Sequence, residues 1–204
     1  MSLENDSLSA CDSELKEIGF KRKRKGIYVR PSTPSADGWV GLNLTRANLP
    51  VSLGVNPVVG VRHAGLESAL LELVDGMPKS PVPSVTRPLG YLMPESRFST
   101  WEFSGGTPLR ETASNLVSAI DEYGAPFIET YSDWASYCAL VDGTGLILDN
   151  QVAKVFPVIA ILNGDKSKAE TLLNGELTRV AQSESVYAVA YRKFAQRFRD
   201  RYLN

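Results

Sequence analysis

Prolines divide this chain into two parts whose apolar residues follow different periods. Five of its twelve prolines fall within residues 76–96. Proline fixes φ and lacks a backbone N–H, so most of this stretch can be neither helix nor central strand. Before it, apolar residues mostly alternate as in strands, and after it they mostly recur at helical spacing. Strands first and helices after predict an α+β fold.

The first part predicts an N-terminal antiparallel sheet of about four to five strands. In residues 39–45, Val40, Leu42 and Leu44 share one face, which is the alternation of a half-buried strand. A break at Asn56-Pro57 separates two of the other candidates. The expected strands cover residues 20–30, 39–45, 51–55 and 58–62, and a fifth, residues 97–103, directly follows the proline-rich stretch. A helix over residues 65–75, ending at Gly76, interrupts them.

The second part predicts helices that pack with this sheet. Thr107 can cap the first helix, which should end at Gly124 and Pro126, and Ser132 can cap the next. Two more helices should flank residues 163–165, with Pro157 kinking the earlier one or lying near its start. The last helix, residues 186–202, carries an aromatic stripe that is more typical of a core than of a base-stacking platform. Its members are Tyr187, Tyr191, Phe194, Phe198 and Tyr202.

We expect residues 1–204 to form one α+β domain. A chain of 204 residues can bury roughly 70% of its unfolded surface, so it needs no disulfide or metal to hold a core. The polar, acidic residues 1–12 predict a flexible leader, followed by a short helix over residues 14–18. Residues 76–96 predict a proline-rich connection that is either functional or disordered.

Cysteine usage and apolar patterning predict a cytoplasmic protein with no membrane partner. Cys11 and Cys138 lie far apart, and we expect two reduced thiols, with Cys138 buried on a helix. No basic stretch followed by an apolar run marks a signal peptide at the N-terminus. The longest apolar stretches, such as residues 155–162, are too short to span a bilayer.

No motif in the sequence predicts catalysis, a metal or a cofactor. His63 is the one histidine, so any Ser-His-Asp triad or Cys-His dyad would have to use it. A structural role at the end of an apolar strand is favoured, because a general base also needs an orienting partner. Metal ligands at helical or turn spacing are missing, and Gly143-Thr144-Gly145 lacks the third glycine of a dinucleotide cradle. We therefore expect that the protein is not an enzyme and that it binds no cofactor or metal. A hydrolase built on scattered carboxylates is a further alternative.

Charge is unevenly arranged although the formal net charge is only −1. Residues 111–153, which we call the acidic segment, hold seven carboxylates and no Lys, Arg or His. Ten of the 22 Lys and Arg residues lie in two short segments, residues 21–25 and 192–201. The near-neutral total is therefore a sum of opposed fields.

Three interpretations of this arrangement compete. In the first, the acidic helices pack beside the basic C-terminal helix and the charges cancel within the fold. In the second, the acidic segment attracts a basic protein, with aromatic residues as anchors. The candidate partner-binding residues are Asp121, Glu122, Glu129, Tyr131, Asp133, Trp134 and Asp142.

In the third interpretation, the basic segments bind nucleic acid. The candidate residues are Lys21, Lys23, Lys25, Arg197 and Arg201. Alternate residues of a strand point to opposite faces, so at most about three of residues 21–25 would meet one phosphate backbone, which gives modest, salt-sensitive affinity. Lysines in such a run more often lie on a solvent-exposed edge strand, where they prevent pairing with the strands of other molecules.

Separate stretches of the chain resemble the bacterial domain of unknown function numbered 4304. They are LKEIGFKRKRKGIYVR at residues 15–30, NLVSAIDEYGAPFIETYSD at 115–133, AILNGDKSKAETLL at 160–173 and YRKFAQRF at 191–198. The resemblance implies an α+β fold without known catalytic residues. Related small domains often resemble immunity proteins or phage-defence accessories.

Together these features predict a non-enzymatic binding protein that neutralises or regulates a basic protein partner, such as a toxin. Its action would be that of an immunity protein or antitoxin. The alternative is a nucleic-acid-associated phage-defence or regulatory factor that uses the two basic segments.

Overall fold

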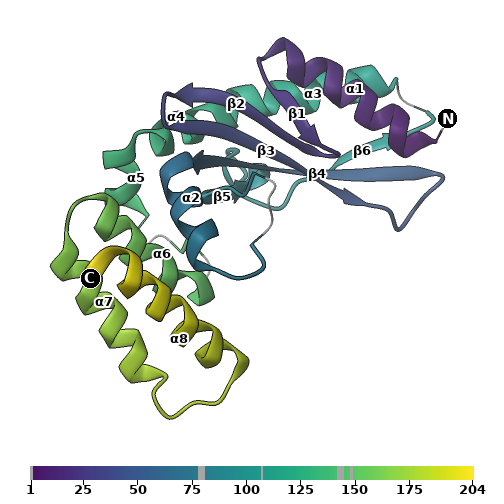
Figure 1. Cartoon of the computed structure of the whole chain (residues 1–204). Helices are drawn as coiled ribbons and strands as arrows, with labels where there is room; N and C mark the ends of the chain where they lie inside the picture. The colour runs from purple at the N-terminus through teal and green to yellow at the C-terminus, as the bar shows by residue number, and fades with distance from the viewer. Residues whose placement is uncertain (1, 78–80, 107, 142–144, 148) are drawn as a thin grey trace.

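The computed structural model describes residues 2–77, 81–106, 108–141, 145–147 and 149–204. Within them, an antiparallel sheet has the order β1-β2-β3-β4-β5, and β6 also pairs with β4 (Figure 1). The strands are β1 (Lys21–Arg24), β2 (Ile27–Thr33), β3 (Ala36–Thr45), β4 (Ser52–His63), β5 (Val85–Pro88) and β6 (Trp101–Ser104). The predicted α+β fold with an N-terminal antiparallel sheet is confirmed.

Helices cover one face of the sheet and extend beyond its end (Figure 1). α1 lies along α3, and α4 packs on β2, β3 and β4, whereas α6 packs against α2 and α7. The helices are α1 (Leu3–Glu17), α2 (Ala64–Leu73), α3 (Leu109–Ala119), α4 (Ala125–Ser132), α5 (Trp134–Leu140), α6 (Asp149–Leu162), α7 (Lys166–Arg179) and α8 (Val186–Phe198). A short 3₁₀ turn, η1 (Leu89–Tyr91), and two π-helical turns, η2 (Ile120–Gly124) and η3 (Arg199–Leu203), complete these elements.

The long β3–β4 hairpin forms the centre of the sheet. Val40 pairs with Val59, and both side chains are fully buried on the face that α4 covers. Val40 and Leu42 are buried on the predicted face, but Trp39 and Gly41 are buried as well, so this part of β3 is covered on both faces and is not the half-buried strand that the alternation predicted. On the opposite face, the Trp39 ring lies over Gly41, where any Cβ would collide with it.

The predicted break at Asn56-Pro57 is wrong, because β4 runs through both residues. β4 pairs with β6 over residues 52–55 and with β5 over residues 58–61. Pro57 falls between these two stretches, so neither β5 nor β6 takes a hydrogen bond from its position. The missing N–H of the proline is therefore tolerated.

The N-terminal residues are not a flexible leader. Residues 3–12 belong to α1, which replaces the short helix predicted over residues 14–18. Leu8, Cys11 and Leu15 are buried and recur at helical spacing along one side of α1. This narrow apolar stripe orders the segment although most of its residues are polar.

Two segments hold more regular structure than predicted. Residues 20–30 form two strands rather than one, because the chain turns at Gly26, whose φ of 72° favours glycine. The described part of residues 76–96 contains β5 and η1, so this connection supplies an edge strand to the sheet. Pro88 ends that strand, a position where a missing N–H is harmless.

The helix predicted to end at Gly124 and Pro126 continues to Ser132. At η2 the Ala125 N–H bonds to the carbonyl of Ile120, five residues back, and this wider turn carries the helix across the proline. The predicted cap at Thr107 lies outside the described residues. Pro157 lies inside α6, as the sequence allowed.

The aromatic stripe of the last helix belongs to the core, as predicted. Tyr191, Phe194 and Phe198 are 0–1% exposed. Ring centroids along the stripe are 5.6 Å apart for Tyr191 and Phe194 and 5.9 Å apart for Phe194 and Phe198. These rings therefore fill the interior of the C-terminal helices and leave no open base-stacking platform.

The two cysteines are free thiols, as predicted. Cys11 is fully buried on α1, and burial raises the pKa of its thiol to about 12. Cys138, which was expected to be buried, is half-buried on α5 instead. In the described part of the chain, every helix is too short or too polar to cross a membrane.

Candidate functional site

The acidic segment runs from α3 through η2, α4 and α5 to the start of α6. Four of its predicted partner-binding carboxylates are exposed, and we call them the acidic surface: Asp121, Glu122, Glu129 and Asp133. A helix rises about 1.5 Å per residue, so these groups spread over roughly 18 Å of the α4 region. Asp142, the fifth predicted carboxylate, lies outside the described residues.

The acidic surface has little positive charge close to it. Asp121 Oδ1 lies 4.0 Å from Arg30 Nη1, at the limit of an ion pair. Arg30 is already held by the carbonyl of Ile18, at 3.0 Å, and its guanidinium lies over the Phe20 ring. Glu122 accepts a hydrogen bond from Tyr123, which raises the pKa of that phenol.

The two flanks of α4 differ in chemistry. Ile128 and Ser132 are buried against the sheet. Successive helical residues are about 100° apart, so Glu129 lies on one flank of this buried ridge and Phe127 and Tyr131 lie on the other. The Phe127 and Tyr131 rings contact each other with centroids 4.6 Å apart. The structure therefore separates Tyr131 from Glu129, although the sequence grouped them in one interface.

The first basic segment, residues 21–25, forms ion pairs with carboxylates on α1. Lys25 Nζ lies 2.6 Å from Glu4, which also pairs with Arg46 at 2.7 Å. Hydrogen bonds from Arg46 and Lys25 lower the pKa of Glu4 to about 2. Lys21 and Lys23 are exposed on β1.

The second basic segment, residues 192–201, forms ion pairs with carboxylates at and just after the end of α2. Arg197 lies 2.7 Å from Asp75, and Arg201 lies 3.4 Å from Glu72. Both basic segments therefore meet carboxylates outside the acidic segment. Among the described residues, the charges do not cancel by pairing the acidic helices with the basic C-terminal helix. Figure 1 also places β1 far from α8, so the predicted nucleic-acid residues do not form one continuous surface.

His63 ends β4 and anchors the junction between α4 and α5. Its ring is 2% exposed, and its Nε2 lies 2.8 Å from the carbonyl oxygen of Tyr131. The ring centroids of Trp134 and Tyr137 lie 5.0 Å and 4.5 Å away. Burial lowers the pKa of His63, opposed by the Tyr131 hydrogen bond and by the charge of Asp133. His63 is thus a neutral packing residue near pH 7, in line with the structural role that the sequence favoured.

Asp133 and Trp134 form a rigid corner beside this histidine. The Ser136 N–H donates to Asp133 Oδ2 at 2.8 Å, which caps α5 and lowers the pKa of the carboxyl group. Trp134 Nε1 donates to Asn163 Oδ1 at 2.7 Å, and its ring stacks on Tyr137. The corner therefore offers a charge and a half-buried aromatic side chain that are already ordered.

Sequence reasoning missed a second aromatic group on the other flank of α4. A cavity of about 280 Å³ lies between that flank and the β5–η1 segment. Its lining includes Phe127, Tyr131, Arg87 and Tyr91, and the Arg87 guanidinium lies over the Tyr91 ring. Arg87 and Tyr91 belong to the proline-rich connection, and no local pattern there indicated that they would reach α4.

The described part of the chain holds no candidate metal site. Within it, no three His, Cys, Asp or Glu side chains gather as a metal ion would require. Asp75 and Glu184 line one groove together, but each faces an arginine, at 2.7 Å and 3.9 Å.

Comparison of the chain with protein-family models, with curated proteins and with solved structures found no match.

Proposed function

We propose that this chain is a binding protein without catalytic activity of its own, and that its acidic surface docks a basic protein partner. One observation carries the proposal. The four carboxylates of the acidic surface are exposed, and the closest ion pairs of the two basic segments, made by Arg22, Lys25 and Arg197, use carboxylates outside the acidic segment. The acidic surface is therefore left to act on charges outside the chain.

Long-range attraction gives such a surface its first role. A field of one sign speeds the encounter with an oppositely charged protein, and the effect weakens as salt screens it. Complementary charge then fixes the register of the complex. Neutralisation or regulation of the partner would follow from covering its basic active or binding surface.

The corner formed by Asp133 and Trp134 supplies the anchor in this proposal. Trp134 is held by Asn163 and Tyr137, so it loses little side-chain freedom when a partner covers it. Tryptophan is enriched among the residues that dominate binding energy. Tyr131, on the other flank of α4, would contact only a partner that wraps around the helix. The resemblance to immunity-like domains adds the expectation that the partner is a toxin.

Charge reversal at Glu122 and Glu129 tests the proposal. Both side chains are exposed, so Glu122→Lys/Glu129→Lys should keep the fold and slow association with the partner about tenfold or more at low salt. The partner is first co-purified from the native host and identified, and association rates are then measured at increasing salt. The wild-type rate should fall with salt, and the variant's dependence should be flatter.

Two further variants sharpen this experiment. Glu170→Lys changes the charge at an exposed position of α7 and should leave association unchanged. Asp133→Asn removes the charge but keeps a good helix cap, so it separates binding from stability. Equal association rates for Glu122→Lys/Glu129→Lys and Glu170→Lys at low salt would rule out the acidic surface. Isolation of a nucleic acid instead of a basic protein would favour the basic segments.

A further inference from the structure

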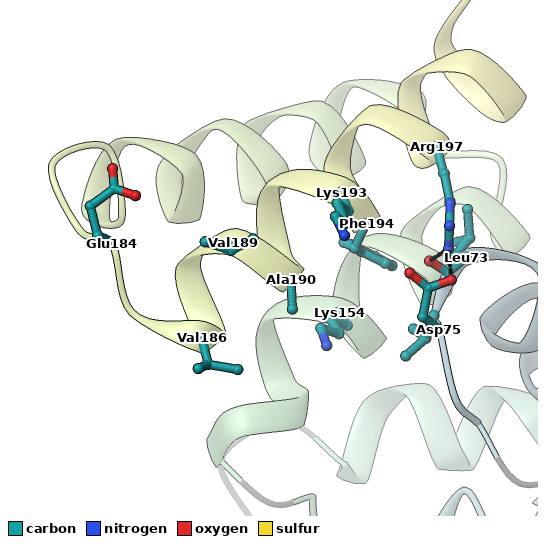
Figure 2. A pocket seen from close by; sticks show the side chains of 11 residues that line it. Leu73, Asp75, Lys154, Glu184, Val186, Val189, Ala190, Lys193, Phe194 and Arg197 are labelled. Carbon is teal, nitrogen blue, oxygen red and sulfur yellow. Dashed lines mark hydrogen bonds and ion pairs between the residues drawn. The ribbon is translucent and has the colours of Figure 1, made fainter.

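An apolar groove opens where α8 meets α6 and the end of α2 (Figure 2). Its volume is about 360 Å³, within the range of small-molecule sites. Leu73 and Phe194 are buried beneath it, and Val186 and Val189 lie along α8. We call this the α2–α8 groove. It lies among the C-terminal helices, away from α4 and the acidic surface.

Two apolar side chains of the groove, both on α8, are open to solvent. Val186 is 89% exposed and Val189 is 39% exposed, one turn apart on α8. Both line the same groove as the buried ring of Phe194, so they continue its apolar surface outward. Contiguous apolar surface of this kind often marks a ligand or partner site.

Two lysine side chains also line the groove. Lys154 comes from α6 and Lys193 from α8, and Figure 2 shows both between Ala190 and the Arg197–Asp75 pair. Arg197 is committed to Asp75, at 2.7 Å, and to the carbonyl of Leu73, at 3.3 Å. None of the ion pairs between described side chains uses Lys154 or Lys193, although the charge of Lys193 helps Arg197 to lower the pKa of Asp75.

The charge of the lining indicates a monoanion. Lys154, Lys193 and Arg197 face two carboxylates, Asp75 and Glu184, so the lining carries one excess positive charge. Glu184 lies at the other end of the groove from Lys154 and Lys193 (Figure 2), so the charge around the two lysines stays positive. A lysine ammonium is a compact point charge that can pair with a single anionic group. Lys154 is half-buried, and the lower local dielectric strengthens its attraction for an anion.

We propose that the α2–α8 groove binds a small amphiphilic carboxylate, with its head between Lys154 and Lys193 and its chain along Val186, Val189 and Phe194. At roughly 30 Å³ for each non-hydrogen atom, the groove accommodates about twelve such atoms. A medium-chain acyl carboxylate has this size, one negative charge and an apolar tail. This site is independent of the proposed protein-binding function.

Calorimetric titration of the full chain with octanoate, at concentrations below micelle formation, tests the proposal. Octanoate should bind saturably at one site. Each buried methylene contributes about fourfold to affinity, so acetate should bind at least about 100-fold more weakly. Octan-1-ol keeps the tail and lacks the charge, so it should bind at least about tenfold more weakly.

Three variants locate the ligand. Lys154→Met and Lys193→Met should each weaken octanoate binding at least about fivefold, because each removes one cation from the head. Ala190→Phe places a ring in the groove and should abolish binding. Its position is exposed, so the fold should persist, as circular dichroism would verify. Lys166→Met, at an exposed position of α7 outside the groove, is the charge-matched control.

Other outcomes overturn the proposal. Absence of saturable octanoate binding would do so directly. Equal binding by wild type and Ala190→Phe would mean adsorption elsewhere on the surface. If octan-1-ol matched octanoate, the lysines would have no role. If a blocked apolar peptide with an internal glutamate displaced octanoate at lower concentration, the groove would belong to a protein segment instead.

Discussion

His63 is a buried side chain whose charge the fold controls. Its imidazole is enclosed by Trp134 and Tyr137, and burial lowers its pKa in the folded state. The unfolded chain keeps a histidine pKa near 6.5, so below about that pH it binds a proton that the folded chain excludes. Stability is therefore full above the unfolded pKa and decreases as pH falls below it.

We expect the free energy of unfolding to fall between pH 6.5 and pH 5, with a slope of at most about 1.4 kcal/mol per pH unit from this single group. Urea titrations at several pH values measure it. His63→Gln keeps a donor for the Tyr131 carbonyl and removes the titration, so its profile should be flatter. Matching slopes for wild type and His63→Gln would contradict the assignment. Carboxylates with a lowered pKa, such as Asp133, lose stabilisation only at more acidic pH.

At the scale of elements, the run from α3 through η2 to α4 depends on one close approach to the sheet. A Cβ at Gly124 would lie 2.9 Å from Val59 Cγ1, a contact that real Cβ atoms essentially never make. Val59 is fully buried and β-branched, so it has little freedom to move aside. The absence of a side chain at position 124 thus sets how closely the helical run lies on β4.

Two glycine substitutions should therefore have opposite signs. Gly124→Ala gains helix propensity but overpacks against Val59, and we expect a net loss of about 1–2 kcal/mol in stability. Gly175→Ala, within α7, meets nothing within 4 Å of its new Cβ and should gain about 0.5–1 kcal/mol. Chemical denaturation of both variants measures the difference. Stabilisation by both would show that propensity alone decides at position 124.

At the scale of the whole molecule, α1 ties the start of the chain to its middle. It lies along α3 and contacts β4 and β6. Leu15 is fully buried at this junction, and the ion pair between Arg110 and Glu14, at 3.1 Å, spans the same two helices. The N-terminal helix therefore closes the core that α3 and the sheet begin.

Leu15→Ala should lower the free energy of unfolding by about 2–5 kcal/mol, because it leaves a cavity under α1. The exposed Glu17→Ala on the same helix should change it by less than about 0.5 kcal/mol. Urea denaturation followed by circular dichroism compares the two. Near-equal effects would mean that α1 is only loosely attached to the sheet and α3.

Local patterns predicted many elements of this molecule because each depends on neighbouring residues. The alternation around Val40 follows the two-residue period of a strand, and the aromatic stripe around Phe194 follows from burial of one face of a helix. The order of α1 was missed because its apolar stripe is narrow and its composition polar. The helix through Pro126 was missed because a π-helical turn leaves no distinct sequence signature.

The sequence by itself determined the α+β class, the core face of the last helix and the uneven placement of charge. These depend on periodicity and counts within short windows. Only the tertiary structure decided where the charges meet, because Glu4 reaches Lys25 and Asp75 reaches Arg197 through contacts between distant segments. The same long-range packing set Tyr131 and Glu129 on opposite flanks of α4 relative to the sheet, and it brought Lys154 and Lys193 to one groove.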